Sequence, residues 1–186
     1  DAMAEATAAA GVSVVTGDTK VVDRGKADGM FVNTTGVGIL HDGFRPDPRG
    51  ARPGDAVLVS GALGRHGMAV MAVREGFAFA REIVSDTADL SPLVASLRQE
   101  LGSQVHALRD ATRGGAASAL NEIAAASGEG VELDEAAIPV PGAVQAACDM
   151  LGLDPLYVAN EGVLVAFVAA DAASRAVELL GGHAAG

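Results

Sequence analysis

Aliphatic side chains provide nearly all the apolar material of this chain, and this limits how its core can be built. Hydrophobic residues make up 49% of the sequence, whereas aromatic residues make up 3% and tryptophan is absent. A core of Ala, Val, Leu and Ile favours mixed layers of helices and strands over an aromatic-rich β-sandwich. The 186 residues are enough for one ordinary domain, or for one domain and part of another.

Short apolar runs and segments with helical spacing follow one another without a regular strand–helix–strand repeat. Apolar spacing, capping residues and glycines predict the element boundaries. Helices are expected at 1–10, 65–76, 91–102, 116–126, 141–151 and 171–182, with Ser91 as the cap of the third. Strands are expected at 12–15, 27–33, 55–61, 105–108, 131–133 and 162–170.

The clearest linker is the polar stretch HDGFRPDPRGARPGD, residues 41–55, which is rich in proline and glycine. Such a composition breaks both helices and strands. We therefore expect a domain boundary here, with one part at residues 1–45 and the other at residues 46–186.

Charge and cysteine content restrict the partners of the chain. A formal net charge of −11 argues against a nucleic-acid or anionic membrane surface, although backbone amides and Mg²⁺ can still hold a nucleotide. The single cysteine, Cys148, allows no internal disulfide and fits a reducing cytoplasm. No apolar run of the sequence approaches the length of a membrane span.

A polar stretch between valines is the first candidate site. In VTGDTKVV, residues 15–22, Asp18 could bind a hard cation, and Lys20 could neutralise a phosphate or donate a proton. The alternative is a solvated hairpin turn, in which Gly, Asp and Thr are ordinary residues.

The second candidate is LRDATRGGAASALNEIA, residues 108–124, where a strand ends and a glycine pair opens a helix. Asp110 stands where a Mg²⁺ ligand could lie, and Arg113 where it could hold a phosphate. Gly114 and Gly115 would let the backbone approach an anion closely. The alternative is that Asp110 or Thr112 caps the helix and the glycines relieve crowding.

The third candidate is the polar pair Asn160 and Glu161, followed by Gly162 and a fully apolar strand. A carboxylate beside buried apolar sequence is a candidate general base, and the alternative is an ordinary turn. His66, at the start of a predicted helix, could donate to a phosphate or a carbonyl group, or could be a surface residue.

Taken together and in order, several of these stretches resemble the hydrogenase maturation protein family HypE. They are VTGDTKVV, GKADGMFVNTTGVG, RHGMAVM, DATRGGAASALNEIA and PLYVANEGVLVAFV. The wider group is the PurM-like ATP-binding superfamily. The resemblance implies an α+β fold with a mixed or antiparallel sheet flanked by helices. It also implies that residues 1–45 complete an N-terminal ATP-binding domain and that residues 46–186 form the PurM-like C-terminal domain.

The resemblance further implies an enzyme, an ATP-dependent carbamoyl dehydratase. Such proteins convert a carboxamide on their own C-terminal cysteine into a thiocyanate, which supplies the cyanide ligands of [NiFe] hydrogenase iron. The implied cofactors are ATP and Mg²⁺. The implied partners are the carbamoyltransferase HypF and the HypC–HypD scaffold complex, and the implied assembly is a homodimer in the cytoplasm.

By the same resemblance, particular residues receive roles. Lys20 and Glu161 would handle protons and position the carboxamide, and Asp18 and Asp110 would hold the metal ion. The expected nucleotide-binding set is Asp18, Thr19, Asp110, Thr112, Arg113, Gly114, Gly115 and Asn160, with Asn160 orienting Glu161 or the substrate.

The sequence departs from the family pattern at both ends. The family's glycine-rich N-terminal part and its cysteine-ending tail have no counterpart here, so we expect a fragment that is inactive alone. Two other hypotheses remain open. One is another PurM-like kinase or synthetase acting on a small metabolite, and the other is a non-catalytic docking module.

Overall fold

A computed structural model of the chain describes residues 2–27, 29–77 and 83–182. These residues divide into two compact units, Asp1–Leu40 and His41–Gly186. The division falls at the start of the predicted linker, five residues before the boundary expected from the sequence. The assignment of the first part to an ATP-binding domain stays a prediction.

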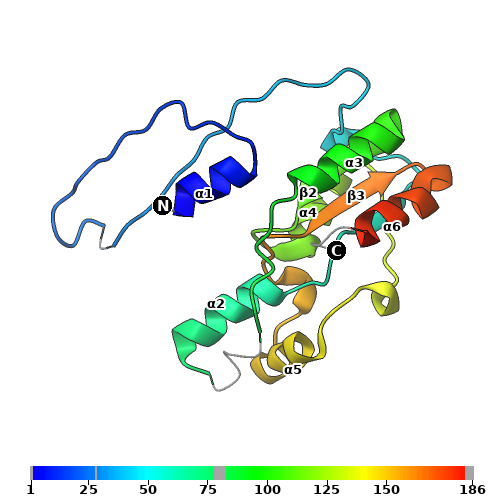
Figure 1. Ribbon diagram of the computed structural model, residues 1–186. Helices are drawn as coiled ribbons and strands as arrows, with labels where there is room; N and C mark the ends of the chain where they lie inside the picture. The colour runs from blue at the N-terminus through cyan, green and yellow to red at the C-terminus, as the bar shows by residue number, and fades with distance from the viewer. Residues whose placement is uncertain (1, 28, 78–82, 183–186) are drawn as a thin grey trace. The chain divides into compact units, whose positions relative to one another are not determined.

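The first unit contains helix α1, Ala2–Ala9, followed by an extended segment (Figure 1). The helix confirms the prediction for residues 1–10. The predicted strands at 12–15 and 27–33 are wrong for the described residues, because none of the residues described before residue 41 forms a strand. A strand needs a neighbour for its backbone hydrogen bonds, and large side chains such as Val15 and Phe31 are 90% and 79% exposed.

The second unit is built on an antiparallel sheet in the order β1-β3-β2. The strands are β1, Ala56–Val59, β2, Val105–Asp110, and β3, Leu164–Val168. All five residues of β3 are buried, so the central strand is covered on both faces. The structure therefore confirms the strands that the apolar runs predict near 55–61, 105–108 and 162–170, and the expected antiparallel sheet flanked by helices.

One face of the sheet packs against helices α3, Ser91–Leu101, and α6, Ala173–Gly181 (Figure 1). Leu93, Leu97 and Leu101 recur at helical spacing on α3 and meet the even-numbered residues of β3. The opposite face packs against α4, Gly115–Ser127, whose Leu120 and Ile123 meet the odd-numbered residues. The sheet is thus the middle of a layered core.

A smaller apolar cluster joins α2, Arg65–Glu75, to α5, Gly142–Leu151. Met68 of α2 packs there with Val144 and Cys148 of α5. Burial raises the pKa of the Cys148 thiol, and Asp149 and Asp154 act in the same direction. The thiol is therefore protonated and inert at neutral pH, as expected for a core cysteine.

The linker is held to the sheet by a buried hydrogen bond between a histidine and a carboxylate. The Nδ1 atom of His106 on β2 lies 2.9 Å from an oxygen of Asp55, and both side chains are less than one-tenth exposed. The backbone N–H of Asp47 also donates to the carbonyl oxygen of His106 at 2.9 Å. Short 3-10 turns occur at Pro48–Gly50, Gly102–Gln104, Glu135–Ala137, Pro155–Tyr157 and Ala170–Ala172.

Two local predictions need correction. Residues 131–133 are extended but form no strand, since they pair with no neighbour among the described residues. Ser91 is the first residue of α3 rather than its cap. Leu90 occupies the N-cap position without a capping side chain, and the Asp89 carboxylate before it supplies the capping bonds by accepting from the N–H and hydroxyl of Ser91. No helix in the described part of the chain is both long and apolar enough to span a membrane.

We expect Asp89→Ala to lower the free energy of unfolding by about 1 kcal/mol, the usual effect of losing a capping carboxylate. The backbone hydrogen bond from Ser91, and then the bond from its hydroxyl, lower the pKa of Asp89. A lowered folded-state pKa contributes stability above the ordinary Asp value of about 3.9, and this contribution is lost as the pH falls through the folded-state value.

Urea unfolding at pH 7 and at progressively lower pH measures the effect. The difference between the wild type and Asp89→Ala should shrink on acidification. The exposed residue Glu132 provides the control substitution Glu132→Ala, which should leave α3 unaffected. Equal stability of Asp89→Ala and the wild type at pH 7 would contradict the assignment of the cap.

Candidate functional site

Several loops meet at one end of the sheet because of its antiparallel register. Val59 at the end of β1 pairs with Val165, and Asp110 at the end of β2 pairs with Leu164. The carboxyl ends of β1 and β2 therefore flank the beginning of β3. This brings together the loops at 60–64, 111–114 and 158–163, which carry most of the predicted site residues of the second unit.

Asn160 joins these loops from the inside. Its side chain is fully buried, and its Oδ1 accepts a hydrogen bond from the N–H of Gly64 at 2.7 Å. Its Nδ2 donates to the carbonyl oxygens of Ala111 and Val158 at 3.0 and 3.1 Å. The side chain is thus bonded to three backbone segments, which makes it a brace beneath the predicted site.

Asp110 and Thr112 lie together where β2 ends. The Thr112 hydroxyl donates to Oδ2 of Asp110 at 2.8 Å, and the Asp110 side chain is exposed. Asp110 also borders a shallow hollow of about 250 Å³ that includes Leu90 and Val94. Thr112 bonds to Asp110 rather than capping α4, so one carboxylate oxygen remains free for a ligand.

The glycine pair lets α4 begin against the loop that precedes β3. Gly114 and Gly115 both have positive φ values, 74° and 62°. A Cβ at Gly115 would collide with the carbonyl oxygens of Leu156 and Val158, and one at Gly114 would collide with the Ser118 hydroxyl. The pair is therefore required for close packing, while exposed Arg113 beside it makes no ion pair among the described residues.

Glu161 projects outward from the same loop that buries Asn160. Its side chain is 44% exposed, and its Oε1 lies 4.0 Å from Nε2 of His66 in the first turn of α2. The His66 Nδ1 atom lies 2.9 Å from the Ser85 hydroxyl. The structure therefore places Glu161 beside an imidazole that a hydroxyl orients from its other side.

Sequence reasoning missed Asp86, which fixes the backbone of this loop. Its Oδ1 accepts hydrogen bonds from the N–H groups of Glu161 and Gly162, and its Oδ2 accepts one from the N–H of His66. Asp86 is 75 residues before Glu161 in the sequence. Nothing in the Ser-Asp-Thr stretch at 85–87 distinguishes it from a solvated turn, so no local signal could have identified it.

The fit of a metal ion can be judged from the available oxygen ligands. The described residues contain no group of three or more His, Cys, Asp or Glu side chains that could hold an ion. Asp110 is an exposed carboxylate with one oxygen outside the Thr112 bond. Such a ligand suits Mg²⁺, which is commonly bound through one or two carboxylates together with substrate phosphates.

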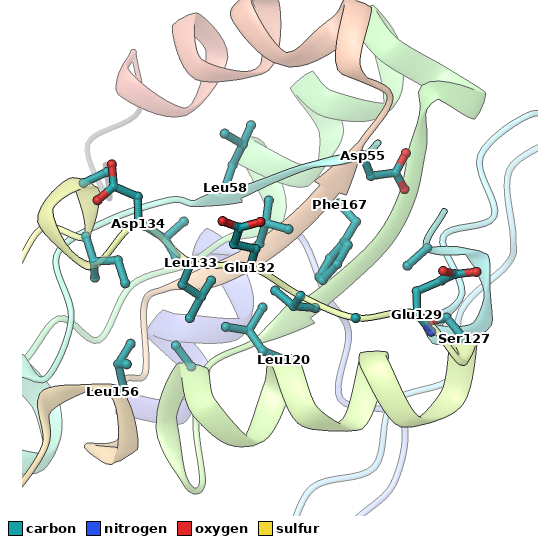
Figure 2. A pocket seen from close by; sticks show the side chains of 18 of the residues that line it. Asp55, Leu58, Leu120, Ser127, Glu129, Glu132, Leu133, Asp134, Leu156 and Phe167 are labelled. Carbon is teal, nitrogen blue, oxygen red and sulfur yellow. The ribbon is translucent and has the colours of Figure 1, made fainter. Parts of the chain in front are cut away.

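A larger hollow of about 710 Å³ lies away from these residues, between the sheet and α4 (Figure 2). Phe167 of β3 and Leu120 of α4 contribute to its apolar floor, and the extended residues 129–134 cross over it. None of the predicted site residues borders it. The hollow therefore lies outside the predicted site.

The structure brings together the predicted residues Asp110, Thr112, Arg113, Gly114, Gly115, Asn160 and Glu161 at one end of the sheet. The predicted residues Asp18, Thr19 and Lys20 are exposed and belong to the first unit. Their participation in the same site stays a prediction.

Residues 52–185 match the family model of the AIR synthase related protein C-terminal domain. The chain is 54% identical to the carbamoyl dehydratase HypE of Cupriavidus necator over all 186 residues, which correspond to 53% of that protein. The chain thus spans about half the length of the curated relatives it matches.

Solved structures give the same result. A crystal structure of a HypE–HypF complex matches with a TM-score of 0.95 and 46% identity, covering 99% of this chain and 60% of that chain. A HypE structure in complex with ATP matches with a TM-score of 0.91 and 49% identity, covering 96% of this chain and 53% of that chain. These neighbours agree with the PurM-like fold expected from the sequence.

We expect Asn160→Ala to lower the free energy of unfolding by about 2 to 4 kcal/mol, because it leaves the buried N–H of Gly64 without a partner and removes packed atoms. Chemical denaturation measures the loss. Asn121 offers a matched control, since within the described part of the chain its amide bonds only to Ala117 on its own helix, and it is an exposed residue. A loss no larger than that of Asn121→Ala would show that Asn160 is not a brace.

Proposed function

Because the chain belongs to the family of AIR synthase related proteins, whose C-terminal domain it contains, we propose that it belongs to an ATP-dependent carbamoyl dehydratase of hydrogenase maturation. The observation that carries this proposal is the outward position of Glu161 beside His66, at the same end of the sheet as the Asp110 and Thr112 pair. The similarity to HypE proteins over the whole chain supports the choice of this reaction.

The proposed reaction dehydrates an S-carboxamide to a thiocyanate, with ATP converted to ADP and phosphate. An amide oxygen is a poor leaving group, so it first attacks the γ-phosphorus of ATP and becomes a phosphate ester. Removal of protons from the amide nitrogen then forms the nitrile and releases phosphate as the C–O bond breaks. The enzyme must therefore bind a polyphosphate and provide a base close to the amide nitrogen.

Glu161 is the residue of the second unit best suited to act as that base. Its carboxylate is exposed, whereas the loop that carries it is held by buried Asn160. Exposure lets the substrate reach the carboxylate, and a rigid loop maintains its position. Lys20, in the first unit, is proposed to work with Glu161 near the carboxamide.

The nucleotide is proposed to lie along the start of α4. Arg113 would neutralise phosphate charge, with Thr112 and the Gly114–Gly115 backbone beside it. Asp110 would hold Mg²⁺ together with Asp18 of the first unit and the phosphates. When bound, Mg²⁺ would neutralise charge that develops on the transferred phosphoryl group.

The proposed partners follow from the same relatives. A HypE structure in complex with HypF supports HypF as a partner, and its proposed role is to load the carboxamide. The HypC–HypD complex as acceptor of the cyanide, a homodimeric assembly and a cytoplasmic location complete the proposal.

Nucleotide binding by the chain can be measured directly. Calorimetric titration of ATP with Mg²⁺ into the 186-residue chain should give binding that Asp110→Asn weakens about tenfold or more, as expected when a metal ligand is lost. Asp171, on a turn before α6, provides the control Asp171→Asn, which should bind like the wild type. Absence of binding would favour a docking module that performs no chemistry.

The role of Glu161 can be tested in a chimera in which this chain replaces the matching segment of the Cupriavidus necator protein. We expect ATP-dependent thiocyanate formation by the chimera, and a loss of about 100-fold or more in kcat for Glu161→Gln, which removes the base. Glu135→Gln, at an exposed turn, should retain activity. An active Glu161→Gln chimera would contradict the assignment, and phosphorylation of a small metabolite instead would favour a PurM-like kinase.

A further inference from the structure

A single carboxylate binds the loop before β3 and the start of α2 at the same time. Asp86 Oδ1 accepts the N–H of Glu161 at 2.6 Å and the N–H of Gly162 at 3.2 Å. Its Oδ2 accepts the N–H of His66 at 3.3 Å. The two residues whose side chains face each other in the site, Glu161 and His66, are therefore both bonded through their backbones to the same side chain.

The backbone of Asp86 also touches this loop. A Cβ placed on Gly162 would collide with the carbonyl oxygen of Asp86, so any other residue at 162 would push the two segments apart. Gly162 is not one of the glycines with a positive φ value. Close approach to Asp86, rather than an unusual backbone conformation, is thus the reason for glycine at this position.

The neighbouring residues of Asp86 act on the imidazole. The Ser85 hydroxyl lies 2.9 Å from Nδ1 of His66 and 2.8 Å from the Thr87 hydroxyl. The Ser85 oxygen also accepts the N–H of Thr87 at 3.1 Å. Because Ser85 is tied to Thr87, the segment 85–87 holds the ring of His66 while Asp86 holds its backbone.

We call the bonds from Asp86 to the N–H groups of Glu161, Gly162 and His66 the clamp. Glu161 depends on the clamp because no helix or strand holds its backbone. It lies outside β3, and its carboxylate has no hydrogen-bond partner shorter than the 4.0 Å approach to His66 among the described residues. The buried side chain of Asn160 bonds the residue before Glu161 to the loop after β2. The carboxylate of Asp86 bonds the backbone N–H of Glu161 itself. The direction of the Glu161 side chain is set between these two contacts.

We propose that Asp86 is a positioning residue, which holds Glu161 at the working distance from the carboxamide by binding the N–H groups of Glu161 and Gly162. The inference rests on the proposed function for the identity of the reaction, whereas the clamp is defined by the hydrogen bonds of Asp86 alone. Loss of the clamp should let the Glu161 carboxylate move by about an ångström, and a misplacement of this size can lower catalysis about 100-fold.

Amide hydrogen exchange of the 186-residue chain tests the clamp without any activity. Asp86→Ala should accelerate exchange at Glu161 and Gly162 by about tenfold or more, while amides within β3 keep their protection. Asp89→Ala is the matched control. It also removes a carboxylate from the segment between α2 and α3, but that carboxylate bonds to Ser91 and not to the loop before β3. Unchanged exchange at 161 and 162 in Asp86→Ala would overturn the proposal.

Asp86→Asn covers the case in which the alanine variant fails to fold. Its amide oxygen can still accept from the loop, so exchange at 161 and 162 should lie between the wild type and Asp86→Ala, or near the wild type if the alanine variant is unfolded. Exchange in Asp86→Asn that is faster than in a folded Asp86→Ala, or that rises equally across β3, would count against a local clamp.

The Cupriavidus necator chimera supplies the second readout. Asp86→Ala should lower kcat between about 10- and 100-fold and leave the KM for ATP unchanged, with partial recovery in Asp86→Asn. A purely structural role would not produce this separation of kcat from KM. Full activity of an Asp86→Ala chimera would overturn the positioning role. An inactive wild-type chimera would count against the proposed function, and the exchange measurement would still decide the clamp.

Discussion

The candidate site depends on the buried side chain of Asn160. Its amide bonds to the backbone of the loops after β1 and β2 and of its own loop before β3. No apolar residue could satisfy these donors and acceptors, and a buried unpaired backbone group is costly. Ser60 is a second buried polar side chain at this end of the sheet, and its hydroxyl accepts a hydrogen bond from the N–H of Leu164. Buried polar side chains thus close the end of an otherwise apolar sheet.

Burial changes from one residue to the next in the loop before β3. Asn160 points inward, Glu161 outward, and Gly162 is buried against Asp86. A reactive carboxylate needs access to substrate and also a fixed backbone, and these demands conflict on a mobile surface turn. Clamping the backbone on both sides of Glu161 resolves the conflict, because the side chain stays accessible while the peptide that carries it does not move freely.

Local sequence was sufficient where one segment determines its own structure. The apolar run at β3 and the helical spacing of α3 are examples, because burial follows directly from residue type. The segments 12–15 and 131–133 have strand-like composition, yet a strand also requires a partner, which can lie far away in sequence. The Asn160 and Glu161 pair was found because polar residues beside a buried strand are unusual. Asp86 was not, since its value lies in contacts across 75 residues.

The distribution of charge limits how much of a polyphosphate the loop after β2 could balance. The net charge of the chain is −11, and ATP is itself an anion, so local cations must offset the repulsion. In the loop after β2, Arg113 is exposed without an ion-pair partner among the described residues, whereas Arg109 bonds to Glu122 at 2.7 Å. One free guanidinium cannot balance a polyphosphate. In the proposed reaction, Mg²⁺ held at Asp110 would supply part of the missing charge, because the ion would neutralise phosphate oxygens that the single guanidinium leaves unpaired.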